Sequence, residues 1–440
     1  MKRLHVALFV MAFSVVGNES ADAARRAADN QTEGVFRQAR QYTVRIRTRI
    51  ETPLAGDEAG VYTGAGFLID AERGWIVTNA HVAGRGPSEV MVAFDGQAFV
   101  RARKLYVDSF ADIAVLSLDR KVDRPGARLA GPQPAPVGEP IGAYGHPLGL
   151  PFTGTRGIVS GHTDLFGPNL TQIDATVDPG NSGGPVIQLG NGEVIGIATA
   201  KSGDDNRDRL NYATPVADVH RILGILRRGG SPRPPRLEFS LLCDEDERTT
   251  MRVGESLNDQ RWPFLAADSI VAVAGVASPV TSLDDLVGGL RGREGAVGVT
   301  VIRQGRRIEV VARPALRADL VERRGVSIDG ARISSIELDD HALIPNRSRL
   351  LIHSVEPSSV ASMRDLAPGD YIHQIDGQSF DSVDSLAAYV RTRAGHPLTI
   401  VVRRGSPDPY RIFESHLREL PGDDIQLIGP EGTTSIAGTD

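Results

Sequence analysis

Short segments in which apolar and polar residues alternate recur along the first half of the chain, and Gly-rich turns separate them. Residues 43–50 show the pattern clearly, because Val44, Ile46 and Ile50 occupy one set of positions and arginines occupy the other. A period of two is typical of a β-strand with one face toward solvent. Further segments of this kind follow as far as residue 197. Many short strands predict closed β-barrels or a sandwich.

The length of the chain predicts several domains, since its 440 residues exceed what one compact core usually holds. Residues 229–235, Gly-Gly-Ser-Pro-Arg-Pro-Pro, have the composition of a linker. Two segments follow, each with the order strand, turn, helix, strand, which indicates an internal duplication. The last residues are polar and Gly-rich and predict a disordered tail.

The N-terminus has the pattern of a secretory signal peptide. Lys2 and Arg3 precede an apolar stretch from Leu4 to Val16, and Ala21-Asp22-Ala23 fits a cleavage site. The stretch is too short to span a bilayer comfortably. We therefore expect cleavage after Ala23 rather than an uncleaved membrane anchor.

Composition and missing motifs exclude several functional classes. The net charge of −6 is not that of a nucleic-acid-binding protein. Cys243 is the single cysteine, so no internal disulfide can form, and we expect a buried free thiol. The sequence has no His-Glu-x-x-His motif, no Cys-x-x-Cys motif and no complete P-loop. We therefore expect no metal and no other cofactor.

Three residues have the pattern of a nucleophilic catalytic triad. His81 follows a buried-looking strand, Asp112 opens another strand, and Ser182 lies in the run Gly180-Asn-Ser-Gly-Gly-Pro185. A serine hydroxyl needs a base to take its proton, and the histidine base needs a carboxylate to hold its tautomer. Alone, each residue also fits a packed histidine, a cap or a surface turn. Together, the order His, Asp, Ser favours catalysis and is that of chymotrypsin-type barrels.

The glycines around Ser182 predict an oxyanion hole. A tight turn can direct the N–H groups of Gly180 and Ser182, with Asn181 between them, toward one point. Gly180 has no Cβ and can adopt the unusual φ that such a turn needs.

Several motifs resemble the signature blocks of the HtrA (Do-like) serine proteases. They are Thr63-Gly-Ala-Gly-Phe-Leu-Ile, Thr78-Asn-Ala-His-Val, Asp112-Ile-Ala-Val-Leu and Asp178-Pro-Gly-Asn-Ser-Gly-Gly-Pro. The two C-terminal segments resemble PDZ domains. The resemblance implies a mainly β chain, with a chymotrypsin/trypsin-like double β-barrel protease domain followed by two small α+β PDZ-like domains. It also implies that His81 is the general base, that Asp112 orients it and that Ser182 attacks the scissile carbonyl.

The resemblance and the composition together predict the domain boundaries. They are a signal peptide (1–23), a flexible N-terminal segment (24–34), a trypsin-like serine protease domain (35–228), a linker (229–236), a degenerate PDZ-like domain (237–318), a second PDZ-like domain (319–418) and a disordered tail (419–440). The first PDZ-like segment departs from the family, because Ala267-Asp268 stands where a Gly-Asp pair is usual.

The leading hypothesis is an ATP-independent serine endopeptidase that degrades unfolded or damaged exported proteins in the periplasm. Two alternatives stay open: a narrow regulatory protease, and a chaperone or binding protein on a protease scaffold. The expected partners are unfolded or misfolded polypeptides and, at the PDZ-like domains, C-terminal peptides. By analogy with the family we also expect a homo-oligomer, a trimer, with Phe36 and Tyr42 as candidate contacts.

Two further sets of site residues are predicted. Small or apolar residues line the expected substrate pocket, and they favour cleavage after Val or Ala: Thr176, Ile197, Ala198 and Thr199. The second set, Arg324, Gly325 and Val326, is a candidate peptide-binding loop, where backbone N–H groups would receive a C-terminal carboxylate beside an added strand. A plain turn is the alternative there.

Overall fold

The structure is a computed structural model that describes residues 29–146, 152–163, 168–200, 211–243, 249–336, 350–405 and 413–436. The predicted signal peptide lies outside these ranges. Within the described part of the chain, no helix is both long and apolar enough to cross a membrane.

A helix of residues 29–42 opens the described chain. The prediction of a flexible segment is therefore wrong for residues 29–34. The helix forms because apolar residues at helical spacing pack on the barrels, with Ala39 and Tyr42 fully buried. At 1% exposure, Tyr42 is not available as a trimer contact. The Phe36 ring stacks on Tyr144 with centroids 5.6 Å apart, and its role between subunits stays a prediction.

Six strands close the first barrel in the order β1-β2-β3-β6-β5-β4. Their bounds are β1 (Thr43–Ile50), β2 (Gly60–Asp70), β3 (Trp75–Thr78), β4 (Glu89–Phe94), β5 (Val100–Asp108) and β6 (Ile113–Ser117). The predicted alternation is confirmed in β1, where Val44, Ile46 and Ile50 are buried while Arg47 and Arg49 are exposed. A one-turn helix, α2 (Ala80–Ala83), follows β3.

Six more strands close the second barrel in the order β10-β11-β12-β9-β8-β7. Their bounds are β7 (Pro140–Gly145), β8 (Thr153–Thr163), β9 (Leu170–Ile173), β10 (Pro185–Gln188), β11 (Val194–Ala200) and β12 (Asn211–Pro215), and α3 (Val216–Arg227) follows. The barrels meet where the Ala65 N–H of β2 donates to the Ser182 carbonyl at 2.8 Å. The expected double β-barrel is thus confirmed.

A five-stranded sheet, in the order β14-β15-β16-β17-β18, follows the barrels. Its elements are β14 (Phe239–Cys243), β15 (Thr249–Ser256), β16 (Ser269–Val273), α4 (Leu283–Leu290), β17 (Val297–Arg303) and β18 (Arg306–Ala312), and a small pair, β13 (Pro235–Arg236) with β19 (Ala315–Leu316), joins the ends of this segment. Trp262 is fully buried in its core. Cys243 is exposed rather than buried, because it ends a strand whose outer residues face solvent.

The C-terminal part forms an eight-stranded sheet in the order β25-β24-β23-β22-β21-β20-β26-β27. Its elements are β20 (Gly325–Ile328), β21 (Ala331–Ser335), β22 (Leu350–Val355), α5 (Val360–Met363), β23 (Tyr371–Ile375), α6 (Val383–Arg391), β24 (Leu398–Gly405), β25 (Phe413–Leu420), β26 (Ile425–Gly429) and β27 (Gly432–Ile436). The last two strands correct the prediction of a disordered tail for residues 425–436, and residues 437–440 lie outside the described ranges. Ile425 is buried in the core of this sheet and Ile428 is 2% exposed, and this burial outweighs the polar composition around them.

The two C-terminal parts repeat one arrangement. In the first, the Asp268 carboxylate accepts from the Leu265 N–H at 2.9 Å and from the Arg303 guanidinium. In the second, Asp370 accepts from the Ala367 N–H at 2.9 Å and is likewise bound by an arginine, Arg404. The repeated aspartate–arginine pair supports the predicted duplication at the level of side chains.

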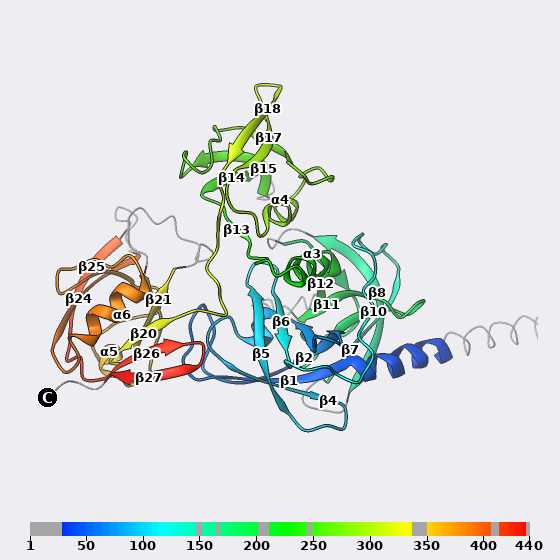
Figure 1. The fold of residues 1–440 in the computed structure, drawn as a ribbon, viewed down its shortest axis with the longest axis horizontal. Coiled ribbons are helices and arrows are strands. Elements are labelled where there is room, and N and C mark those ends of the chain that lie inside the picture. The colour runs from blue at the N-terminus through cyan, green and yellow to red at the C-terminus, as the bar shows by residue number, and fades with distance from the viewer. Residues whose placement is uncertain are drawn as a thin grey trace, which may run out of the picture.

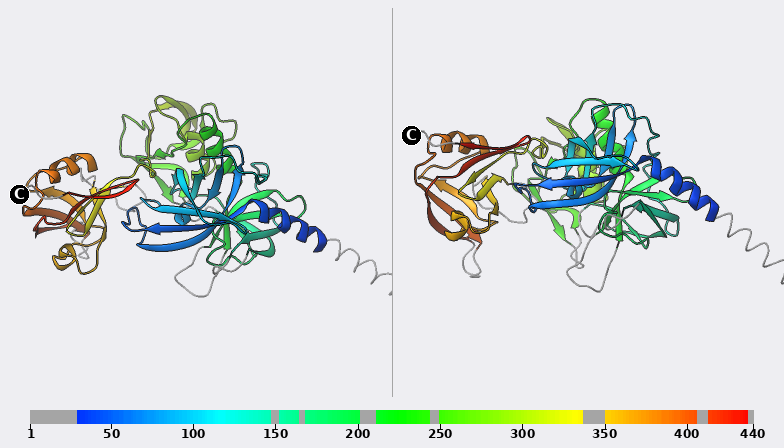
Figure 2. Two further views of the ribbon diagram at one scale, coloured as in Figure 1. Left: turned by 60° about the horizontal axis from the view of Figure 1, so that its bottom comes forward. Right: turned by 90° about the horizontal axis from the view of Figure 1, so that it is seen from below.

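Both C-terminal parts contact the first barrel (Figures 1 and 2). Arg291, which caps α4, forms a fully buried ion pair with Asp108 at the end of β5. The loop between β1 and β2 reaches the eight-stranded sheet instead. There the Ser354 hydroxyl donates to the Pro53 carbonyl at 2.9 Å, and the Ala55 N–H donates to His353 Nδ1 at 3.3 Å.

Candidate active site

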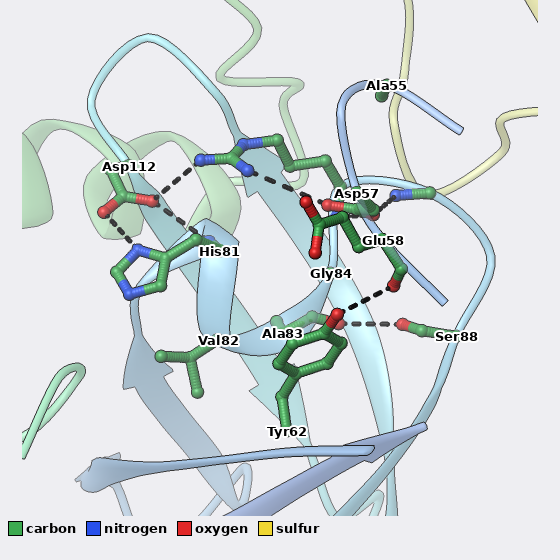
Figure 3. A network of polar contacts seen from close by, with 12 residues as sticks. Ala55, Asp57, Glu58, Tyr62, His81, Val82, Ala83, Gly84, Ser88 and Asp112 are labelled. Carbon is green, nitrogen blue, oxygen red and sulfur yellow. Dashed lines mark hydrogen bonds and ion pairs between the residues drawn. The ribbon is translucent and has the colours of Figure 1, made fainter. Parts of the chain in front are cut away.

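His81 is placed by the end of β3. Asn79 precedes α2 in an extended conformation, with φ −78° and ψ 152°, and the helix turns the chain so that His81 lies beside Asp112. The two side chains point toward one another (Figure 3). His81 Nδ1 lies 2.7 Å from Asp112 Oδ2, and the His81 backbone N–H donates to Asp112 Oδ1 at 3.0 Å. Both carboxylate oxygens therefore orient the histidine.

Asp112 sits on a strained backbone. Its φ is +52°, which a side chain other than glycine rarely adopts. It lies directly before β6. The segment that leads into Asp112 is held by the Asp108 carboxylate, which accepts a hydrogen bond from the Ala111 N–H at 3.0 Å. Such strain persists only where the surrounding structure fixes it, and it is frequent at functional sites.

Asn79 ties the acid to the second barrel. Its side-chain amide donates to the Asp112 carbonyl at 2.9 Å and to Thr199 Oγ1 at 3.0 Å, and Asn79 is fully buried. Sequence reasoning missed this role, although Asn79 lies in the same motif as His81. The available signal in the sequence was an amide side chain two residues before the histidine, directly after an apolar strand.

Ser182 lies in the second of two overlapping turns. The Asn181 N–H donates to the Asp178 carbonyl at 2.9 Å, and the Gly184 N–H donates to the Asn181 carbonyl at 2.9 Å. Glycine stands at the third position of each turn, Gly180 with φ +106° and Gly183 with φ +87°. A type II turn requires positive φ at that position, so the spacing of the glycines follows from the two turns.

The turns also bear on Asn181, which lies between the two expected oxyanion donors. Because the Asn181 N–H is used within the first turn, it is not directed at a substrate. The N–H groups of Gly180 and Ser182 stay as the predicted oxyanion donors.

Close packing joins this turn to the histidine. A Cβ placed on Gly64 would lie 2.5 Å from Val82, the neighbour of His81, and 3.1 Å from the Ser182 carbonyl oxygen. A Cβ on Gly183 would lie 2.1 Å from the Ala65 carbonyl oxygen. The three predicted catalytic residues are thus brought to one junction between the barrels, where glycines permit the close approach.

A polar network missed by sequence reasoning surrounds Asp112 (Figure 3). Arg85 Nη2 lies 3.9 Å from Asp112 Oδ1, and Arg85 Nη1 lies 3.7 Å from Asp57 Oδ1. Asp57 Oδ2 accepts from the N–H groups of Arg85 at 2.7 Å and Gly86 at 2.9 Å. Burial raises the pKa of Asp57, while these N–H groups and the guanidinium act to lower it.

Lys104 completes this network from β5. Its ammonium donates to the carbonyls of Gly84 and Gly86 and to Ser88 Oγ. Burial lowers the pKa of Lys104 to about 8, although the Asp57 carboxylate acts to raise it. The loop after α2 is thus held from both sides, by Asp57 and by Lys104.

A cleft of about 300 Å³ opens beside the His81–Asp112 pair. His81, Arg85, Asp112, Leu170 and Thr199 are among its lining residues. Of the predicted pocket residues only Thr199 lines this cleft. Ile197 and Ala198 are fully buried in β11, where their side chains pack in the barrel cores, and their role in a substrate pocket stays a prediction. Thr176 is exposed, outside this cleft.

The predicted peptide-binding loop runs into β20. Gly325 and Val326 belong to this strand and are buried, whereas the Arg324 side chain is largely exposed. β20 pairs with β21 on one edge and with β26 on the other. In this structure both edges of β20 are paired within the chain, and binding of an added peptide strand at these residues stays a prediction.

Comparisons with known proteins agree with this geometry. Residues 64–197 match the family described as trypsin-like peptidase domain. Residues 351–404 match the PDZ domain family. The chain therefore carries a trypsin-like peptidase domain and a PDZ domain.

Curated relatives carry protease names. A probable periplasmic serine endoprotease DegP-like of Chlamydia pneumoniae is 27% identical, over 78% of this chain and 74% of the relative. The serine protease Do-like HtrA of Bacillus subtilis is 31% identical, over 53% of this chain and 55% of the relative. Together with the trypsin-like domain, these relatives support a serine-type endopeptidase.

Solved structures share the fold. The HtrA-type protease AlgW with tripeptide matches with a TM-score of 0.53 and 23% identity, over 65% of this chain and 97% of that chain. The likeness confirms the mainly β, trypsin-like architecture.

Proposed function

We propose that Ser182, His81 and Asp112 hydrolyse peptide bonds through an acyl-enzyme intermediate. The observation that carries this proposal is the His81 Nδ1 to Asp112 Oδ2 hydrogen bond of 2.7 Å, together with the double turn that contains Ser182 at the junction of the two barrels. The match of residues 64–197 to the trypsin-like peptidase domain family supports the proposal independently.

Each residue has one role in this mechanism. The Asp112 carboxylate accepts from His81 Nδ1, which leaves Nε2 free to take the Ser182 hydroxyl proton as Oγ attacks the carbonyl carbon. His81 then gives that proton to the leaving amine, and the C–N bond breaks. Water repeats the sequence on the acyl-enzyme and releases the carboxylic acid. The N–H groups of Gly180 and Ser182 stabilise the oxyanion in both halves.

We propose unfolded or damaged exported proteins as substrates and the periplasm as the compartment. The predicted signal peptide and the relatives named periplasmic endoproteases support this assignment. Residues 237–318 act as a degenerate PDZ-like domain in the proposal, supported by the aspartate–arginine pair that they share with the matched PDZ domain. The chain works as a homo-oligomer in this scheme.

The test is digestion of β-casein, a loosely folded protein, by the wild-type chain and by Ser182→Ala. Loss of the nucleophile should lower turnover by roughly 10⁴-fold or more. Ser160→Ala is the matched control, because Ser160 is exposed on β8, and it should retain full activity. Equal turnover by wild type and Ser182→Ala would refute the mechanism. No turnover by either would favour the binding-protein alternative.

The same digests report the cleavage preference. Among the described residues that line the cleft, Asp112 is the one carboxylate, and it is hydrogen-bonded to His81, so none is left for a basic side chain and cuts should follow Val or Ala. Mass spectrometry of the fragments gives the cut sites, and a dominant preference for Lys or Arg would reject the predicted pocket.

A further inference from the structure

Strand β20 is paired along both edges. On one edge it forms a hairpin with β21 through Asp329 and Gly330, whose φ values are +47° and +96°. On the other edge β26 runs antiparallel, so that Gly325 lies opposite Ile428 and Ile328 opposite Ile425. Figure 1 shows β26 beside β20 with β27 following. A strand paired on both sides offers no free row of N–H and C=O groups.

Extended peptides bind PDZ domains by adding a strand to an exposed sheet edge. In this chain β26 has the geometry of such an added strand, because it is extended, antiparallel and joined to β20 through backbone hydrogen bonds. It also brings apolar side chains. Ile425 is fully buried in the same core cluster as Val326 of β20 and Leu386 of α6, Leu427 packs against that cluster, and Ile428 is 2% exposed.

A buried carboxylate fastens the segment that leads into β26. Asp329 Oδ2 accepts from the Gly422 N–H at 2.8 Å, and Oδ1 accepts from the Asp424 N–H at 2.9 Å. The Asp329 N–H in turn donates to the Asp424 carbonyl at 2.7 Å. The turn between β20 and β21 therefore positions the incoming strand in one register.

We propose that the hairpin of β26 and β27 is an internal ligand of the PDZ domain, occupying the β20 edge that an outside peptide would use. Other peptides that are extended and carry apolar side chains then bind at β20 only when this hairpin dissociates from it. The proposal refines the peptide-binding part of the proposed function and does not depend on proteolysis.

The connection to β25 makes the internal ligand hard to displace. β25 ends at Leu420 and β26 begins at Ile425, so the tether is short. A short tether gives an effective concentration of about 1 mM. If the hairpin itself has an intrinsic dissociation constant of about 10 μM for this edge, a free peptide would bind the intact chain about 100-fold more weakly than a chain without the hairpin.

The experiment measures peptide binding in trans, with Ser182→Ala as the background so that nothing is cleaved. The probe is a fluorescein-labelled synthetic peptide of residues 423–436, followed by fluorescence anisotropy. A chain that ends at Gly422 should bind the probe about 100-fold more tightly than the full chain. The same peptide with Ile425→Ser and Ile428→Ser is the control and should not bind the shortened chain. Equal binding of the probe by both chains would overturn the proposal.

A full-length variant covers the case in which the shortened chain fails to fold, as circular dichroism would reveal. Ile428→Ala weakens the docked hairpin without removing it, and should bind the probe at least 10-fold more tightly than the Ser182→Ala parent. Thr434→Ala, on the exposed face of β27, is the matched control and should bind like the parent. Unchanged binding by Ile428→Ala would overturn the proposal as well.

Discussion

At the scale of single residues, Gly183 shows how closely the two barrels meet. Its φ of +87° is strained for any other residue, and an added Cβ would lie 2.1 Å from the Ala65 carbonyl oxygen and 2.2 Å from Thr78 Oγ1. Both oxygens are already committed, since the Thr78 hydroxyl donates to the Ala65 carbonyl at 2.7 Å. Neither oxygen can move away from an added Cβ without separating the two barrels at this contact.

Gly183→Ala should therefore lower the stability of the protease domain by about 2 kcal/mol or more, because strain at positive φ alone costs of order 1–3 kcal/mol. It should also reduce activity on β-casein. Gly190→Ala is the control, since Gly190 is exposed with nothing within 4 Å of an added Cβ, and it should change stability by less than about 0.5 kcal/mol. Urea unfolding measures both variants, and a Gly183→Ala as stable as the control would contradict the packing argument.

The sequence predicted the three catalytic residues better than it predicted the residues that hold them in place. His81, Asp112 and Ser182 stand in short motifs with turn or strand signals, so local pattern sufficed to propose them. Asn79 and Arg85 act through partners distant along the chain, Thr199 and Asp112, and no local pattern encodes such contacts. The burial of the Ile197 and Ala198 side chains in the barrel cores could not be predicted either, because it depends on how β11 packs within the closed barrel.

At the scale of elements, alternation and turn signals predicted the strands of the barrels, whereas composition misjudged residues 425–436. A strand such as β26 gains its stability from pairing with β20, about a hundred residues earlier, and from burying Ile425 and Ile428. The surrounding Gly, Thr and Ser residues suggest disorder when read alone. Local composition carries no information about a partner strand about a hundred residues away in the chain.

The contact between β22 and the β1–β2 loop depends on a neutral histidine. His353 Nδ1 accepts from the Ala55 N–H, so Nε2 carries the proton and donates to the Ser335 carbonyl at 3.1 Å. Burial and the nearby Arg323 guanidinium lower the pKa of His353 to about 4. A proton on Nδ1 would face the Ala55 N–H and break this hydrogen bond.

Acid should therefore loosen this contact. The unfolded histidine has a pKa of about 6.5, so between that value and about 4 the unfolded state binds the proton and the folded state does not. The stability from neutral His353 is present above pH 6.5 and is lost as the pH falls through this window. Thermal unfolding from pH 7 to pH 4 should show a shallower acid dependence for His353→Gln than for wild type. The exposed His396→Gln should keep the wild-type slope, and the idea fails if both variants behave alike.

At the scale of the whole molecule, the buried pair of Arg291 and Asp108 joins the five-stranded sheet to the loop that carries Asp112. Both side chains are fully buried. Burial would raise the pKa of Asp108, but the Arg291 charge and the N–H of Ala111 hold it below its ordinary value. The guanidinium also donates to the Tyr106 hydroxyl and to the Pro232 carbonyl, each at 3.0 Å.

Arg291→Ala should destabilise the chain by about 3–5 kcal/mol, because it leaves the Asp108 carboxylate buried without its partner. Arg291→Met combined with Asp108→Asn should recover part of that loss by removing the charge. The exposed pair of Arg103 and Asp119 supplies the control, and Arg103→Ala should cost less than about 1 kcal/mol. Urea unfolding gives the comparison, and a loss for Arg291→Ala no larger than that of the control would count against this account.

The hairpin of β26 and β27 also sets the order in which the chain can fold. β20 leaves a ribosome or an export channel about a hundred residues ahead of β26, so its outer edge and the apolar surface around Val326 stay uncovered until then. Uncovered strand edges invite aggregation during synthesis and transport. The C-terminal sheet can therefore close only after residue 429 has emerged, and a chain interrupted before that point would present the kind of open edge that marks a damaged protein.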